Sequence, residues 1–173
     1  HLLAHGADAR RILVLMFNKS ARDDFAARLE RRLPAVARPA VSTFHSFGMR
    51  LCNSLVHSGI LPSAKLLATP RECIRFTQGI LTTFNAGRPE TAALASGDES
   101  LLEYLDIFDL LKGSLYVVGD PLPTLPIGNN DVLDFFPVFE QNRKASGVRF
   151  FADLISDPVV AAIASSDVAS FIA

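Results

Sequence analysis

Two short clusters of aromatic and small polar residues could contact a nucleic acid in this 173-residue chain. An aromatic side chain can stack on a base, hydroxyl and amide groups can hydrogen-bond to phosphate oxygens, and a lysine can neutralise a phosphate. Each cluster directly follows a short apolar run and leads into a helical pattern. The first consists of Phe17, Asn18, Lys19 and Ser20, and the second of Thr43, Phe44, His45 and Ser46.

The elements around the clusters predict a parallel β-α-β unit. Residues 12–17 show no polar alternation, as expected for a central parallel strand covered on both faces. Residues 40–43 are expected to form a second short strand, followed by a helix that begins at Phe44 or His45, runs to His57 and is ended by Gly59. Because parallel strands joined by a helix end at the same edge, the clusters should meet where α/β sheets bind ligands.

The helix between these strands is predicted from its apolar spacing. Ser20 is the expected N-cap, with Asp23 and Asp24 in the first turn, where the helix dipole favours acids. One stripe at spacings of three and four should be buried. It comprises Ala21, Phe25, Ala26, Leu29 and Leu33.

Each cluster residue also has an ordinary structural interpretation. Phe17 could pack in the core beneath the following helix, and Asn18 to Ser20 could simply cap that helix. His45 could be a structural histidine that forms hydrogen bonds. The occurrence of two such junctions one β-α-β unit apart is more informative than either alone.

Charge is unevenly distributed along the chain. The net charge is −1, but residues 1–50 carry +5 and residues 51–173 carry −6. The basic part contains both clusters, and a local basic face can attract phosphates even in a nearly neutral protein. The arginines could equally be solvated helix-face residues. Nearly half of the residues are apolar, so a packed core is expected.

From residue 60 onward the sequence predicts a mostly helical insertion with few strand signals. Helices are expected at 71–84, beginning at Pro70, and then at 98–111, 131–145, 150–155 and 158–164. Residues 113–130 read as a long loop with an extended piece at 115–118. Leu133, Phe136 and Phe139 should lie inside. Asp153 and Asp157, four residues apart, are expected to be surface or capping groups.

Several classes of site are missing from the sequence. It contains no GxxxxGK[ST], HExxH or GxSxG pattern and no acidic pair at a strand end. Cys52 and Cys73 form no CxxC pair, so we expect a reduced intracellular protein with neither disulfide nor zinc. No signal peptide or membrane-spanning run is evident. Both ends interrupt a helical pattern, and we expect the chain to be a fragment.

Four segments resemble parts of the UvrD/Rep-like superfamily 1 DNA helicases. ILVLMFNKSARDDFAARL resembles the motif after the family's P-loop helix, and STFHSFGMRLC resembles its next motif, of the form TFHSF. His1 to Gly6 looks like the tail of the P-loop helix. FEQNRKASGVRFFADLI, at 139–155, resembles the segment that closes the family's helical insertion. Met16, Lys19 and Phe151 depart from the residues usual there, namely Thr, Asn and Asp.

The resemblance implies an α/β fold, a partial RecA-like P-loop NTPase domain with a parallel β-α-β core and a mostly α-helical inserted subdomain. Residues 1–58 would belong to the motor domain, 59–148 to the insertion and 149–173 to the return. The intact protein would be an ATP-dependent helicase that binds single-stranded DNA and unwinds duplexes, usually 3′ to 5′, in repair, replication or recombination. Phe17 would meet a base. The DNA backbone would lie along Asn18, Lys19 and Ser20 and along Thr43, Phe44, His45 and Ser46.

ATP and Mg²⁺ would be bound in the intact protein by groups outside these residues, so this chain alone should bind neither and hydrolyse no ATP. Expected partners are single-stranded DNA, duplex junctions and the remaining motor domains of the same chain, in the cytoplasm at the nucleoid and away from membranes. One alternative is a non-catalytic DNA-binding or adaptor module of the same fold. Another is an unrelated α/β protein whose Phe-Asn-Lys-Ser run only caps a helix.

Overall fold

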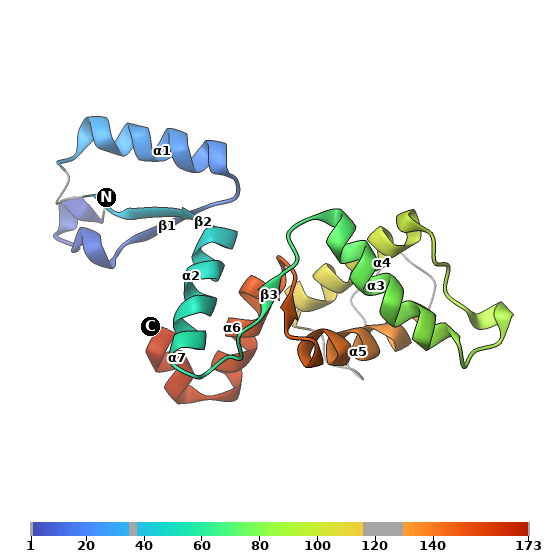
Figure 1. Cartoon of the computed structure of the whole chain (residues 1–173). Helices are drawn as coiled ribbons and strands as arrows, with labels where there is room; N and C mark the ends of the chain where they lie inside the picture. Colours follow the sequence, from blue (N-terminus) through green and yellow to red (C-terminus); the bar gives the residue numbers. More distant parts are fainter. Residues whose placement is uncertain (1, 35–37, 116–129, 173) are drawn as a thin grey trace. The chain divides into compact units, whose positions relative to one another are not determined.

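The computed structural model describes residues 2–34, 38–115 and 130–172, and the chain is a mostly helical α/β protein (Figure 1). These residues form seven α-helices and two parallel sheets of two strands each. The chain divides into two compact units, residues 1–54 and 55–173, with the division inside helix α2. None of the helices in the described ranges has the length and apolarity needed to span a bilayer.

The first unit contains the expected parallel β-α-β arrangement. Strand β1 (Leu13–Met16) is followed by α1 (Lys19–Arg32), β2 (Ala40–Thr43) and α2 (Phe44–His57). β1 and β2 pair in parallel, with Leu13 opposite Ala40 and Met16 opposite Thr43. The predicted strands, their direction and the helix over 44–57 are therefore confirmed. The first residues form a 3-10 turn that Gly6 ends in the left-handed conformation.

Strand β1 is less covered than its apolar sequence predicts. Leu13 is 39% exposed, and the other three residues are only half-buried. The described sheet has only two strands, and α1 contributes no fully buried side chain. The stripe on α1 is half-buried at best, and Ala21 is exposed. The prediction of a strand covered on both faces is thus wrong for this chain.

Helix α1 begins two residues earlier than predicted, because Asn18 caps it instead of Ser20. Asn18 has extended backbone angles, and its side-chain oxygen accepts a hydrogen bond from Ala21 N at 2.8 Å. Ser20 lies within the first turn. Asp23 and Asp24 consequently fall beyond that turn, where the helix dipole stabilises them less.

The second unit contains α3 (Pro70–Asn85), α4 (Asp98–Gly113), α5 (Asn130–Ala145), α6 (Asp153–Ala164) and α7 (Ser166–Ile172). Thr69 and Glu72 form a reciprocal capping box around Pro70, which explains why α3 starts where predicted. The expected start of α4 at Asp98 is also confirmed. The loop expected over 113–130 lies mostly outside the described residues, as does its extended piece apart from Leu115.

An aromatic core joins α3, α4 and α5. Phe108, Phe135 and Phe139 are completely buried, and the ring centroids of Phe108 and Phe139 lie 4.7 Å apart. Close aromatic pairs add to the hydrophobic stabilisation of a core. The predicted interior positions Phe136 and Phe139 are confirmed, whereas Leu133 is only half-buried.

A second parallel pair was not predicted. β3 (Lys65–Leu66) pairs with β4 (Val148–Arg149), with Lys65 opposite Val148. Strands of two residues carry no detectable periodicity, so the sequence gives no signal for them. The two helical segments expected at 150–155 and 158–164 are instead a single helix, α6, which continues through Pro158.

Candidate nucleic-acid interface

Phe17 directly follows β1, and the residue is 86% exposed. The alternative in which Phe17 packs beneath α1 is therefore wrong. A solvated phenylalanine between a strand and a helix gains nothing from core packing, but it presents a ring face on which a base can stack.

The polar residues after Phe17 open helix α1. Asn18 uses its side-chain oxygen for the cap, so it acts as the capping residue that the structural interpretation required. Lys19 and Ser20 are the first two residues of the helix, and both are exposed. A positive side chain and a hydroxyl therefore stand beside the positive end of a helix dipole, where anions are favoured.

The second junction has its own internal hydrogen bonds. The Thr43 hydroxyl donates to Ser46 Oγ at 2.9 Å, and Ser46 N donates to Thr43 Oγ1 at 3.2 Å. These bonds fix the first turn of α2. Phe44 is 45% exposed, and His45 is exposed beside it.

Strand register brings the two junctions to one edge. Met16 and Thr43 are opposite each other in the parallel pair, so Phe17 and Phe44 follow the same step of the ladder. Neighbouring strands lie about 4.8 Å apart. All eight predicted residues therefore gather at the carboxyl edge of one sheet, each strand contributing an exposed aromatic and several polar groups.

Several arginines of this unit are engaged by nearby acids. Arg22 pairs with Asp23 at 2.6 Å, and Arg28 with Asp24 at 3.6 Å. These ion pairs support the interpretation that the arginines belong to the solvated face of α1. Lys19, by contrast, forms no ion pair within the residues that the structure describes, which leaves its charge available to a phosphate.

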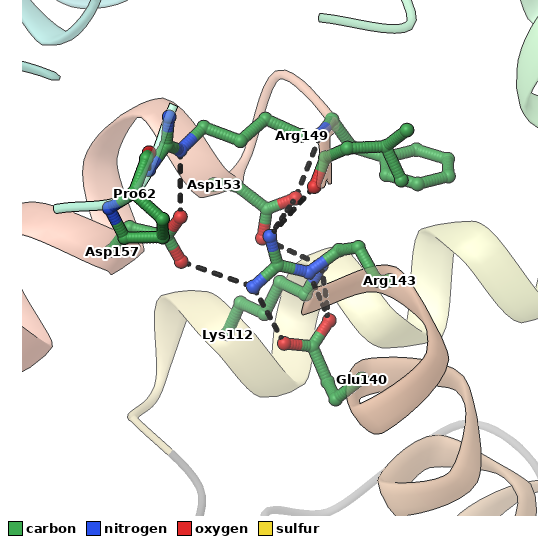
Figure 2. Close-up of polar contacts among 9 residues, drawn as sticks. Pro62, Lys112, Glu140, Arg143, Arg149, Asp153 and Asp157 are labelled. Carbon is green, nitrogen blue, oxygen red and sulfur yellow. Dashed lines mark hydrogen bonds and ion pairs between the residues drawn. The ribbon is translucent and has the colours of Figure 1, made fainter. Parts of the chain in front are cut away.

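The second unit contains a buried ionic cluster that sequence reasoning missed (Figure 2). Lys112 Nζ lies 2.8 Å from both Glu140 Oε1 and Asp153 Oδ1. Arg143 contacts the same two acids at 2.9 and 3.3 Å and Asp157 at 3.0 Å. The buried ionic cluster comprises Lys112, Glu140, Arg143, Arg149, Asp153 and Asp157.

The sequence predicted that Asp153 and Asp157 are surface or capping groups. Neither lies on the surface, because both belong to the buried ionic cluster. Asp153 is fully buried, and its Oδ2 accepts a hydrogen bond from Phe150 N at 2.7 Å. Ala152 is the N-cap of α6 and no side chain caps the helix, so Asp153 is not a capping group either. Asp157 accepts hydrogen bonds from Arg143 and Arg149. Arg149 in turn donates to the carbonyl oxygen of Pro62 at 3.0 Å.

Burial and ion pairing shift the pKa values of the carboxyl groups in opposite directions. Burial raises the pKa of Asp153 above its ordinary value, although Lys112 and Arg143 oppose the shift. Burial also acts to raise the pKa of Glu140, but the hydrogen bond from Arg143 and the charge of Lys112 outweigh it, and that pKa is lowered. The cluster balances three cations against three carboxylates, and each carboxylate contacts two cations. We therefore assign the cluster a structural role rather than one in acid-base chemistry.

One signal in the sequence points to this cluster. Lys112 stands four residues after the core residue Phe108, and Arg143 stands four residues after Phe139. Residues four apart share a helix face, so both basic side chains continue an apolar stripe into the interior. A basic residue on such a stripe requires a buried acidic partner.

The helicase resemblance implies ATP and Mg²⁺ for the intact protein. No group of three histidine, cysteine, aspartate or glutamate side chains in these ranges could hold a metal ion. The sequence also contains no GxxxxGK[ST] loop to bind phosphates.

No protein-family model matches the chain, and no curated protein sequence matches it significantly. Any functional assignment therefore rests on the motifs and on the geometry of the two junctions.

Proposed function

We propose that this chain is part of an ATP-driven DNA helicase or translocase of the UvrD/Rep-like superfamily 1 and forms one wall of its single-stranded DNA track. Phe17 stacks on a base, while Lys19, Ser20, Thr43, His45 and Ser46 contact the neighbouring backbone. Asn18 caps α1 and holds Phe17 and Lys19 in position, so its part in DNA binding is indirect.

One observation carries the proposal: an 86% exposed phenylalanine at the end of a parallel strand whose neighbour ends in a second exposed aromatic and polar cluster. Single-strand-binding proteins combine aromatic platforms with basic groups in this way. The first unit has a net positive charge, which favours a negatively charged, phosphate-rich ligand over a neutral metabolite.

The same proposal extends to the fold. The β1-α1-β2 unit would be a portion of a RecA-like motor domain, and the helices of residues 59–148 an insertion into it. ATP and Mg²⁺ would then be bound by groups that this sequence lacks. Incubating the chain with ATP, Mg²⁺ and single-stranded DNA should release no phosphate above the rate without protein, and DNA-stimulated release would contradict this division of labour.

The test of the DNA track is the binding of a fluorescent oligothymidylate to the chain, followed by anisotropy. Phe17→Ala should weaken binding by about 1–3 kcal/mol, the usual contribution of base stacking, which is roughly 5- to 150-fold. Phe17→Tyr should retain most of the affinity because it keeps the ring.

The matched control is Phe171→Ala, which removes another exposed phenylalanine, in α7 of the second unit. Its affinity should equal that of the wild type. If Phe17→Ala binds as tightly as this control, the stacking role is wrong.

A further inference from the structure

A hollow of about 610 Å³ lies at the start of α3, in the second unit. Its more buried lining is apolar and consists of Leu67 and Phe76, whereas its exposed lining is basic and consists of Lys65, Arg71 and Arg75. The volume falls within the range typical of small-ligand sites, about 300–1,000 Å³.

The acid in this hollow is already engaged. Glu72 accepts hydrogen bonds from the Thr69 hydroxyl at 3.0 Å and from Lys65 Nζ at 3.3 Å. The Thr69 hydroxyl oxygen in turn accepts a hydrogen bond from Glu72 N. The capping box therefore occupies one of the N–H groups at the start of α3. The charge available to a ligand therefore comes from the arginines rather than from the helix terminus.

Arg71 and Arg75 stand four residues apart, so they share one face of α3. Neither forms an ion pair or a hydrogen bond through its guanidinium group within residues 2–34, 38–115 and 130–172. Two exposed guanidinium groups without partners, beside an apolar surface, form an arrangement suited to an anion that carries an apolar ring.

Phe76 is held firmly enough to act as a platform. Its ring packs edge-on against Phe139 and Phe150, with centroid distances of 6.2 and 6.0 Å. The ring therefore loses little additional freedom when a ligand binds, which lowers the entropic cost of binding.

We infer that this hollow binds one nucleotide of a single-stranded nucleic acid, with the base against Leu67 and Phe76 and the adjoining phosphates on Arg71 and Arg75. An acidic peptide would use the arginines but has no planar ring attached to each charge, so it would leave the apolar lining unused. The site lies in the second unit and does not depend on the junctions at Phe17 and Phe44, so it goes beyond the function proposed above.

The experiment compares Arg71→Ala/Arg75→Ala with the wild-type chain in oligothymidylate binding over a range of salt concentrations. Affinity should fall at least tenfold at low salt, and the slope of log K against log salt should become less steep by about 1.4, the equivalent of two phosphates at about 0.7 each. The matched control is Thr82→Glu/Thr83→Glu, which makes the same charge change at two exposed positions of α3.

Ultraviolet cross-linking of the bound oligothymidylate provides a second readout that does not depend on the charge change. The adduct should map to the peptide that contains Phe76 and should disappear in the double arginine variant. The same measurements in a Phe17→Ala background separate the two sites, because loss at one should leave the other measurable.

Equal affinity and slope in the arginine variant and the threonine control would overturn the inference. So would an adduct absent from the Phe76 peptide, or competition by free thymidine monophosphate or polyglutamate as effective as that by the oligonucleotide.

Discussion

The ammonium group of Lys112 lies 2.8 Å from Asp153 Oδ1, and both side chains are almost completely removed from solvent. Helix α4 carries the cation and helix α6 the anion. Removing one of the two side chains leaves the other charge buried without its partner. Substitutions in this pair should therefore lower the free energy of unfolding of the second unit.

Lys112→Met should lower the free energy of unfolding by about 3–5 kcal/mol, the usual cost of removing one partner from a buried ion pair. Glu140 and Asp153 would then lose a shared cation. Urea titration followed by circular dichroism measures the change. Asp167→Asn, at an exposed position in α7, is the control and should change stability by no more than about 0.5 kcal/mol.

A double-mutant cycle of Lys112→Met and Asp153→Asn should show coupling between the two residues. The double variant should lose about 0.5–3 kcal/mol less than the sum of the single variants, because each single change already weakens the same contact. Additive losses would mean that the two charges act independently.

Acid should destabilise the chain partly through Glu140. Its folded-state pKa lies below its ordinary value, because Arg143 and Lys112 outweigh the effect of burial. The stabilisation is therefore complete above the unfolded-state pKa of about 4.3 and is lost as the pH falls through the folded-state pKa. In Glu140→Gln the free energy of unfolding should fall less steeply between neutral and acidic pH than in the wild type.

Asp153 should produce the opposite dependence. Burial raises its pKa, so the folded state holds its proton at pH values where the unfolded state has released it. Its contribution to stability should decline as the pH rises from the unfolded-state pKa through the raised folded-state pKa. The test is the free energy of unfolding of the wild type minus that of Asp153→Asn, measured as a function of pH. If this difference rises with pH, as expected for Glu140, the assignment is contradicted.

Lys19→Ala should make the salt dependence of single-stranded DNA binding less steep by about 0.7, as expected for one phosphate on a single strand. Arg28→Ala is the matched control, because it removes one positive charge from the same helix at a residue that pairs with Asp24. Identical slopes for the two variants would indicate that Lys19 contacts no phosphate.

Local signals explain why much of the fold could be predicted. The apolar runs before Phe17 and Thr43 identify β1 and β2, and the Thr69-Pro70 start of α3 carries both a capping box and a helix-initiating proline. The cap of α1 was misassigned because Asn18 and Ser20 are both good capping residues. Only the backbone conformation distinguishes them.

The features that the sequence did not predict depend on distant partners. β3 and β4 pair residues that are far apart in the chain, and each strand is too short to show a period. Asp153 resembles a surface acid in the sequence, and only the packing of α4 and α5 against it brings Lys112 and Arg143 to its carboxylate.

The pairing of β3 with β4 also determines how the chain would carry a mechanical load. Tension applied between Pro62 and Asp157 would pull the two parallel strands in shear. It would be borne first by the bonds from Lys65 N to Gly147 O and from Leu67 N to Arg149 O, and by the Arg149 contact with Pro62. Helices α3, α4 and α5 lie in the loop that these bonds close, so they would feel no force until the bonds break.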